Sequence, residues 1–281
     1  MPDLRPMDFG EILDGSLMIY RRHFGLFLKL AMAALSVPLV LLVYFGLRAI
    51  AELQQNPVRA LLYLVPVGLV YYVASLVLTA GTIRVISDSY LGREPRLRDA
   101  LSLGWSRLWP LTAVGFGKGI VLMLITLGVG VVAGVGATLF RGAGALLTVA
   151  LVVGGCWFII YVACGYGLTT PVVVLEELGS SFDAFGRSWE LTRSFKLKVL
   201  GLAVVAFLLT NLIPSLVFRG LGAAFLGSAP PLGVALTAVG FVAPLALAPV
   251  LAAVITLMYY DLRVRREAFD LQVLGQRLGI I

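Results

Sequence analysis

Long stretches without a charged residue constrain the fold of this chain more than any other feature of its sequence. A helix needs about 20 predominantly apolar residues to cross a bilayer. Six uncharged runs follow, in order, Lys29, Arg59, Lys118, Arg141, Lys198 and Arg219, with lengths of 18, 24, 22, 34, 20 and 41 residues. Residues 227–231 (Gly-Ser-Ala-Pro-Pro) mark a turn that leaves one helix in the last run. The sequence predicts an all-α integral membrane protein with six transmembrane helices.

Composition excludes several other classes of protein. Hydrophobic residues make up 60% of the 281 and charged residues 13%, whereas soluble domains have about 45–50% and about 25%. One histidine and two cysteines limit metal and acid–base chemistry, so we expect no enzyme activity, no metal and no cofactor. Cys156 and Cys164 are expected to be buried, unpaired thiols. A soluble enzyme, a nucleic-acid binder and a disulfide scaffold are all poor interpretations.

The distribution of positive charge predicts the orientation in the membrane. Seventeen of the 22 Lys and Arg residues lie in segments that share one side, namely 5–29, 84–107, 187–198 and 263–277. The opposite side has Arg48, Arg59, Arg141 and Arg219, and Lys118 lies within a span. Because Lys and Arg accumulate in cytoplasmic loops, we expect both termini in the cytoplasm and the chain in the cytoplasmic (inner) membrane.

The segments on the basic side resemble one another. Each begins as an amphipathic stretch, with apolar side chains at helical spacing, and runs into an odd-numbered span. In the first, Phe9, Ile12, Leu13, Leu17, Tyr20 and Phe24 form the stripe, and Asp8 and Glu11 form a capping-box-like start. The second and third start near Pro95 and Ser180. We predict one membrane domain, residues 1–281, with pseudo-repeats of about 8–92, 93–178 and 180–267 and a cytoplasmic tail, 261–281.

Each predicted repeat is an interfacial amphipathic helix followed by a helical hairpin. Such a helix lies at the headgroup boundary, with its apolar side toward the acyl chains. The alternative interpretation makes the amphipathic stretches the cytoplasmic ends of long tilted spans. Both interpretations give six spans and no domain outside the cytoplasm.

A few residues within the spans are candidates for a role in the membrane. A charged side chain such as that of Lys118 is energetically costly inside the membrane. It marks either a functional site or a side chain that reaches back to the headgroups. Asn211 and Pro214 interrupt the fifth span, and Pro171, Pro244 and Pro249 interrupt others; these are either ordinary kinks or broken helices that expose backbone to a substrate. Gly128, Gly130, Gly134 and Gly136 allow close helix packing, with a pore lining as the alternative.

Three short sequence motifs, called words below, resemble those of a known family. They are residues 10–16 (GEILDGS) ahead of 20–22 (YRR), residues 185–193 (FGRSWELTR) and residues 259–270 (YYDLRVRREAFD). Together they resemble the bacterial membrane-protein family named for the membrane domain of glycerophosphoryl diester phosphodiesterases. The resemblance implies a polytopic helical bundle with structural or partner-facing roles for Gly10, Glu11, Asp14, Gly15, Arg187, Ser188, Trp189, Thr192, Arg193, Tyr260, Asp261, Arg263, Arg265, Phe269 and Asp270.

The resemblance does not extend to phosphodiesterase activity. The barrel that gives the family its name employs paired histidines and metal-binding carboxylates, but here His23 is the only histidine and 11 residues follow Asp270. We expect a non-enzymatic scaffold or accessory subunit in membrane lipid or envelope processes. Its partners would be anionic lipid headgroups at the cytoplasmic face and a membrane protein, without nucleic acid. The alternative is a transporter or lipid-translocating permease, with a site between the repeats near Lys118 and Asn211.

Overall fold

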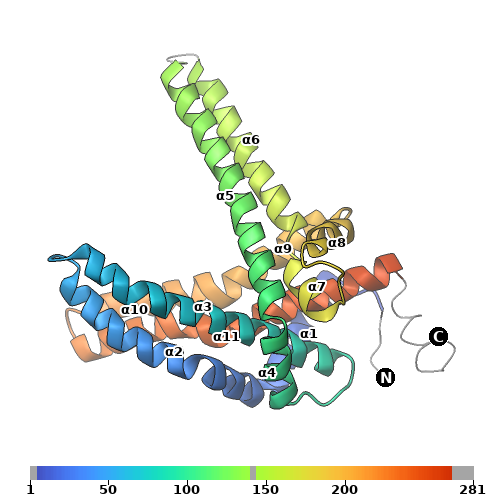
Figure 1. Ribbon diagram of the computed structural model, residues 1–281, viewed down its shortest axis with the longest axis horizontal. Coiled ribbons are helices and arrows are strands. Elements are labelled where there is room, and N and C mark those ends of the chain that lie inside the picture. The colour runs from blue at the N-terminus through green and yellow to red at the C-terminus, as the bar shows by residue number, and fades with distance from the viewer. Residues whose placement is uncertain (1–4, 140–143, 268–281) are drawn as a thin grey trace. The chain divides into compact units, whose positions relative to one another are not determined.

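A computed structural model describes residues 5–139 and 144–267, and within these the chain is helical with no strand (Figure 1). The helices are α1 (Phe9–Arg22), α2 (Phe24–Glu52), α3 (Pro57–Tyr90), α4 (Leu97–Ser106), α5 (Leu108–Leu139), α6 (Gly144–Gly165), α7 (Thr169–Leu175), α8 (Asp183–Thr192), α9 (Lys196–Phe207), α10 (Ile213–Phe225) and α11 (Pro230–Glu267). A π-helical turn, η1 (Leu208–Leu212), joins α9 to α10.

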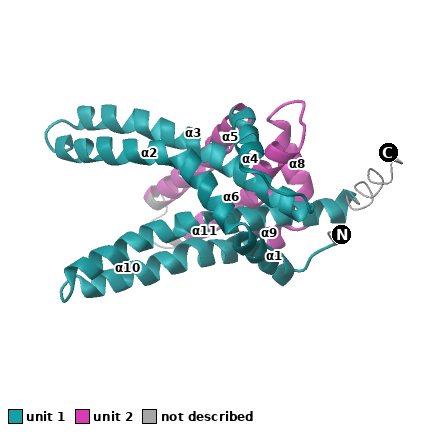
Figure 2. Cartoon of the chain, turned by 90° about the horizontal axis from the view of Figure 1, so that it is seen from below, with its two compact units in different colours: residues 1–108, 201–281 teal, residues 109–200 magenta. Residues whose placement is uncertain are grey.

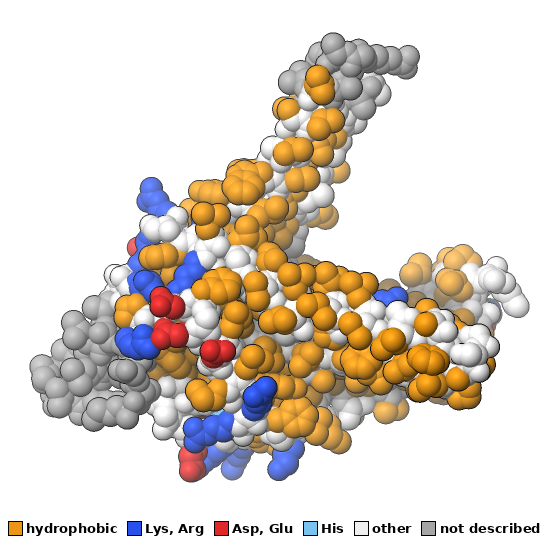
Figure 3. Space-filling view, turned by 180° about the vertical axis from the view of Figure 1, so that it is seen from behind, with side chains coloured by type: hydrophobic (Ala, Val, Ile, Leu, Met, Phe, Trp, Pro, Cys, Tyr) orange, Lys and Arg blue, Asp and Glu red, His pale blue; other side chains and the backbone are white. Residues whose placement is uncertain are grey.

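Six helical segments of the described chain are long and apolar enough to cross a membrane, as the uncharged runs predict. They are Phe24–Glu52, Pro57–Tyr90, Leu108–Gly136, Thr148–Leu175, Lys196–Phe225 and Pro230–Glu267. Hydrophobic side chains cover most of their visible surface (Figure 3). Because such a surface is stable only in an apolar solvent, the all-α membrane class is confirmed.

The chain forms two compact units (Figure 2). Unit 1 comprises residues 1–108 and 201–281, and unit 2 comprises residues 109–200. These boundaries do not coincide with those of the predicted pseudo-repeats, which stay a prediction.

In unit 1, two helical hairpins are built from α2 with α3 and from α10 with α11. Asn56 begins α3 by accepting a 3.2 Å hydrogen bond from the N–H of Arg59, with Pro57 at the first helical position. In the second hairpin, a Cβ on Gly233 would lie 2.8 Å from the carbonyl oxygen of Gly222, so the two backbones are in direct contact. Small residues thus set this packing, as is typical of membrane helices.

Each predicted amphipathic stretch is a helix of its own, separate from the span that follows. Asp8 and Glu11 form the predicted capping box of α1, and His23 separates α1 from α2. The start predicted at Pro95 is wrong by two residues, because α4 begins at Leu97 after an extended Arg96. The amphipathic stretches are therefore not continuous with the spans that follow them.

Unit 2 contains the α5–α6 hairpin, in which the glycine prediction is only partly correct. A Cβ on Gly128, Gly130 or Gly134 would meet nothing within 4 Å. The close approaches are elsewhere: a Cβ on Gly136 would lie 2.8 Å from Thr148 Oγ1, and one on Gly155 would lie 2.6 Å from Val129. Periodicity identified small residues but could not say which of them face the neighbouring helix.

Two of the predicted interruptions are real and two are not. The fifth span changes to the π-helical turn η1 at Asn211, and the fourth span breaks between α6 and α7, just before Pro171. By contrast, α11 continues through Pro244 and Pro249, because a long apolar helix can absorb a missing N–H by local adjustment.

Candidate functional site

The word at residues 259–266 holds the N-terminal segment against α11 in unit 1. Asp261 is completely buried, and its Oδ1 accepts a 2.7 Å hydrogen bond from the N–H of Met7. Arg265 Nε donates to both oxygens of Asp261, at 3.0 and 3.1 Å, and its Nη2 donates to the Met7 carbonyl at 3.0 Å. The carboxylate is therefore compensated on two sides, which a buried charge requires.

The word at residues 10–16 packs α1 against α11. A Cβ on Gly15 would lie 3.2 Å from Leu257 Cδ1, so the helices approach closely at this glycine. Glu11 accepts from the N–H of Asp8 at 2.8 Å and forms an ion pair with Arg5. Asp14 is exposed on α1, and Gly10 has open space around its Cα.

Tyrosines join the ends of α3 and α11. The Tyr260 hydroxyl shares a 2.7 Å hydrogen bond with Ser87, and the Tyr260 ring stacks on Tyr90 with centroids 5.0 Å apart. Arg263 Nη1 donates to the Tyr259 hydroxyl at 3.1 Å, and its Nε donates to Glu267 at the same distance. These contacts fix the polar ends of both helices.

His23 links the α1–α2 junction to α3. Its Nε2 lies 3.0 Å from Ser89 Oγ. Partial burial, with a smaller contribution from the neighbouring Arg22, lowers the pKa of His23. The imidazole is therefore held neutral at neutral pH, in the form that can accept or donate at this contact.

An open pocket of about 800 Å³ lies among the same elements of unit 1. It is lined by the N-terminal segment, α1, the end of α3 and one residue of α11. Gly92, with φ of 71°, forms part of the wall by ending α3 in a left-handed turn, with Gly92 N–H bonded to Ser89 O and Arg93 N–H to Asp88 O. The charged residues of the lining are Arg5, Glu11, Asp14 and Arg22.

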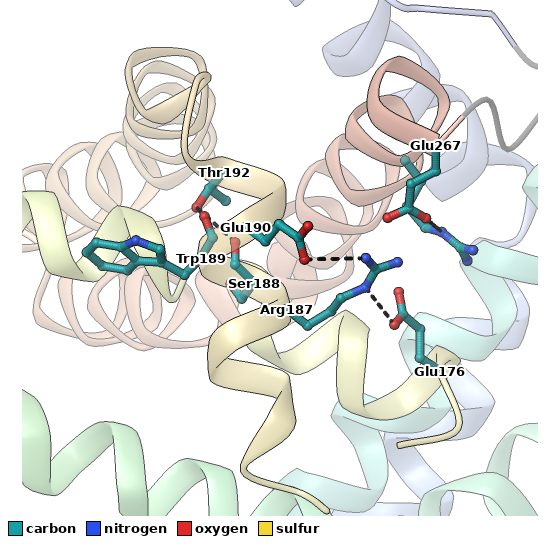
Figure 4. A network of polar contacts seen from close by, with 8 residues as sticks. Glu176, Arg187, Ser188, Trp189, Glu190, Thr192 and Glu267 are labelled. Carbon is teal, nitrogen blue, oxygen red and sulfur yellow. Dashed lines mark hydrogen bonds and ion pairs between the residues drawn. The ribbon is translucent and has the colours of Figure 1, made fainter. Parts of the chain in front are cut away.

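The word at residues 185–193 has a different task, in unit 2. The α6 helix ends at Gly165, and its last carbonyl accepts hydrogen bonds from Ser188 Oγ at 2.7 Å and Thr192 Oγ1 at 3.3 Å. Ser188 Oγ also accepts from the N–H of Leu168 at 3.2 Å. Both hydroxyls come from one face of α8 (Figure 4). They satisfy backbone groups that the break between α6 and α7 would otherwise leave unpaired.

Arg187 connects α8 to the end of α7. Its Nε donates to Glu176 at 3.0 Å, and its Nη1 lies 3.8 Å from Glu190 (Figure 4). Arg187 and Glu176 are both largely shielded from solvent. The pair therefore fixes the segment that crosses from the fourth span to α8.

Aromatic rings surround a lysine beside this break. Trp189 packs directly on Gly165, where a Cβ would collide with the indole. Lys196 Nζ lies 3.5 Å from the Trp189 ring centroid and 3.2 Å from that of Tyr161. The ammonium is buried and has no hydrogen-bond partner in the part of the chain that the structure describes. Two π faces thus take the place of water around this charge.

The two residues singled out within the spans lie in different units. Lys118 Nζ donates to the Tyr166 carbonyl at 3.2 Å, at the break between α6 and α7 in unit 2. Asn211, in unit 1, donates to Thr210 Oγ1 at 2.8 Å within η1. Each lies where a helix is irregular and its carbonyls are less fully used by backbone bonds.

Within unit 1 the structure brings together Glu11, Asp14, Gly15, Tyr260, Asp261, Arg263 and Arg265, from the first and last words. Within unit 2 it brings together Arg187, Ser188, Trp189 and Thr192, whereas Arg193 is exposed at the end of α8. Phe269 and Asp270 lie outside the described residues. Cys164 is buried, but the expectation for Cys156 is wrong, because its thiol is exposed on α6.

Sequence reasoning missed Gly165, Glu176 as the partner of Arg187, and Lys196 as a buried cation. The available signal was the pairing of Tyr161 and Trp189 with a lysine at the start of a span, which periodicity alone does not distinguish from a headgroup-facing lysine. The geometry provides structural ion pairs, capped helix ends and a pocket of mixed polarity. Comparison of the chain with protein-family models, curated proteins and solved structures finds no match.

Proposed function

We propose that the chain is a non-enzymatic multi-pass protein of the cytoplasmic membrane, a scaffold or accessory subunit in membrane lipid or envelope processes. One observation carries this proposal: a buried or largely shielded charged side chain in each of two distinctive words, Asp261 and Arg187, is held by specific partners at a helix end. Asp261 is held by Arg265 and by the Met7 backbone, and Arg187 by Glu176. Groups fixed in this way stabilise a rigid polar surface and are poorly placed to exchange protons with a substrate.

The short helices supply the outward-facing part of that surface. On α1 the structure buries Ile12, Ser16 and Ile19, so Phe9 and Leu17 of the predicted stripe remain exposed. Trp105 of α4 is likewise 62% exposed, as is Phe182 near α8 at 59%. Exposed apolar side chains on short, charged helices support an interfacial position, and their recurrence before three spans supports the threefold plan.

The predicted orientation follows from the sorted charges and remains part of the proposal. It is tested in a cysteine-free chain (Cys156→Ser, Cys164→Ala) with one new cysteine at Arg98 or at Arg59. Both positions are exposed, and the predicted topology places them on opposite sides of the membrane. An impermeant maleimide should label position 59, but not 98, in intact cells, and the reverse pattern would overturn the orientation.

The scaffold role is tested by partner recovery from native membranes with a tagged full-length chain. Asp14→Ala and Arg193→Ala change exposed residues of the short helices, so the fold should persist while co-purified partners are lost. Arg59→Ala removes an exposed charge at the other end of the span and serves as the matched control. If both test variants retain every partner and every phenotype of the wild type, the scaffold proposal is wrong.

A transporter or lipid-translocating permease is the second candidate, and the two irregular spans favour it. The Lys118 contact with a carbonyl at the α6–α7 break is the specific observation. Transporters use such discontinuous helices to bind ions and substrates. Flux into vesicles containing the purified chain, lost in Lys118→Ala and retained in Arg59→Ala, would favour transport. Absence of specific flux with both proteins folded would reject it.

A further inference from the structure

The pocket of unit 1 contains two charged groups that no described residue engages by a hydrogen bond or ion pair. Of its four charged lining residues, Arg5 and Glu11 form an ion pair, and Glu11 also accepts from the Asp8 backbone. Asp14 and Arg22 are exposed, and no hydrogen bond or ion pair joins either of them to another described residue. One carboxylate and one guanidinium are therefore available to a ligand.

The spacing of these groups suits a ligand that carries both signs of charge. Asp14 and Arg22 are eight residues apart on α1, about 12 Å along the helix axis. The long arginine side chain leans back toward the helix N-terminus and shortens that separation. Both residues also line a smaller adjoining hollow with Leu17, Met18 and Arg21. Asp14 and Arg22 thus line both hollows.

The rest of the pocket lining has an apolar part, from α1 and α11, and a polar part, from the end of α3. Ile19 and Leu257 are buried at the wall that α1 shares with α11, and Met18 is 67% exposed beside them. Ser89 and Tyr90 contribute from the end of α3. Because α2 enters its apolar span at Phe24, two residues after Arg22, the pocket lies at the charged end of a span. An amphipathic ligand with an acyl chain matches this position better than a water-soluble metabolite.

We propose that this pocket binds a phospholipid whose headgroup is a phosphate linked to a primary amine, of the phosphoethanolamine type. Arg22 holds the phosphate, and Asp14 accepts hydrogen bonds from the ammonium group. The larger pocket is lined by two basic and two acidic residues, which favours this ligand over an anionic lipid, because an anionic lipid would place its net charge beside Asp14. A quaternary ammonium has no N–H to donate. This site does not depend on the scaffold role and is more selective than the attraction of anionic headgroups that the sequence predicts.

Binding is measured on the full-length protein in detergent, by native mass spectrometry, with phosphatidylethanolamine, phosphatidylcholine and phosphatidylglycerol of identical acyl chains. The wild type should prefer phosphatidylethanolamine by up to about fivefold, the upper end of the range for an exposed charge pair. Asp14→Asn should remove the preference while leaving total lipid binding intact. Arg22→Gln should weaken all three lipids, because each has a phosphate.

Two control variants test whether the effects are specific to the pocket. Asp99→Asn and Arg59→Gln make the same chemical changes at exposed positions outside the pocket and should leave the preference unchanged. Equal binding of the three lipids by the wild type, or an unchanged preference in Asp14→Asn, would overturn the proposal. Competition by free glycerophosphoethanolamine as strong as that of the lipid would overturn the acyl-chain part and make the pocket a site for a soluble headgroup.

Discussion

Asp261 on α11 accepts a 2.7 Å hydrogen bond from the backbone N–H of Met7, although 254 positions separate the two residues in the chain. Arg265 completes the arrangement by bonding both the Asp261 carboxylate and the Met7 carbonyl. The beginning of the described chain is thereby fixed to the end of the last span. Because the Asp261 carboxylate is completely buried, loss of either partner would leave its charge poorly compensated and destabilise the fold.

The first prediction concerns this contact. Asp261→Ala should lower the free energy of unfolding by about 3 kcal/mol, because it leaves the Met7 N–H and the Arg265 guanidinium without their shared acceptor. Asp261→Asn keeps an acceptor oxygen and should cost less. Thermal unfolding in detergent measures both, with the exposed Asp99→Asn as control. Equal melting temperatures for Asp261→Ala and the control would contradict the assigned role.

The second prediction concerns the contact of α4 with α3. A Cβ on Gly104 would lie 2.8 Å from the carbonyl oxygen of Val77, and this backbone cannot rotate away. Gly104→Ala should therefore displace α4 and cost about 1–3 kcal/mol. Gly46→Ala is the matched control, because its Cβ meets nothing within 4 Å, and it should be neutral or stabilising by up to about 1 kcal/mol. Similar melting temperatures for the two variants would show that α4 does not pack as described.

The third prediction concerns Gly165 and Trp189. Gly165→Ala should destabilise unit 2, because the new methyl group collides with the indole. The same substitution should cost much less in a Trp189→Leu background, where the ring is absent. Gly154→Ala, in open space on the same helix, is the control. Identical costs of Gly165→Ala in both backgrounds would contradict the contact.

The fourth prediction concerns Lys196 between its two rings. A double-mutant cycle of Lys196→Met and Tyr161→Leu should give a coupling energy of about 1–2 kcal/mol, the range for a desolvated cation–π contact. The change in the free energy of unfolding caused by Lys196→Met alone has no expected sign, because the substitution removes both the cation–π attraction and the cost of burying the charge. Additive effects of the two substitutions on unfolding would rule out the interaction.

The fifth prediction concerns pH. The folded state lowers the pKa of His23 through partial burial and the nearby Arg22, so the unfolded chain binds a proton more readily. Stability from this group is therefore present above the unfolded pKa of about 6.5 and is lost as pH falls below it. The melting temperature should decrease from pH 7.5 to pH 5.5 more in the wild type than in His23→Gln. Parallel pH profiles would exclude His23 as the cause.

The sequence predicts the fold class because the bilayer imposes it. Runs of 18 to 41 uncharged residues leave a chain no alternative to spanning helices, since every backbone polar group must be satisfied within the segment. Turn residues such as Asn56 and Pro57 determine their helix start locally. The glycine prediction was correct only for Gly136, because spacing along one helix does not say which side its neighbour occupies.

The candidate site was predictable only in part. Glu11, Arg187 and Asp261 could be singled out from their words, but the groups that they contact could not, because spacing does not show which groups meet in space. The Glu11–Arg5 pair is local, whereas the Asp261–Met7 contact joins distant segments. The sequence placed Lys196 only among the basic residues of segment 187–198, and its position against Tyr161 and Trp189 came from the structure.

By itself, the sequence determined the membrane class, the number of spans and the short helices that precede three of them, since these depend on local hydrophobicity and capping. Only the tertiary structure decided which polar groups pair, which of the candidate interruptions break a span, and which two charges of the α1 pocket no described residue engages. Those properties arise from contacts between residues far apart in the chain, and a one-dimensional pattern contains no distance between them.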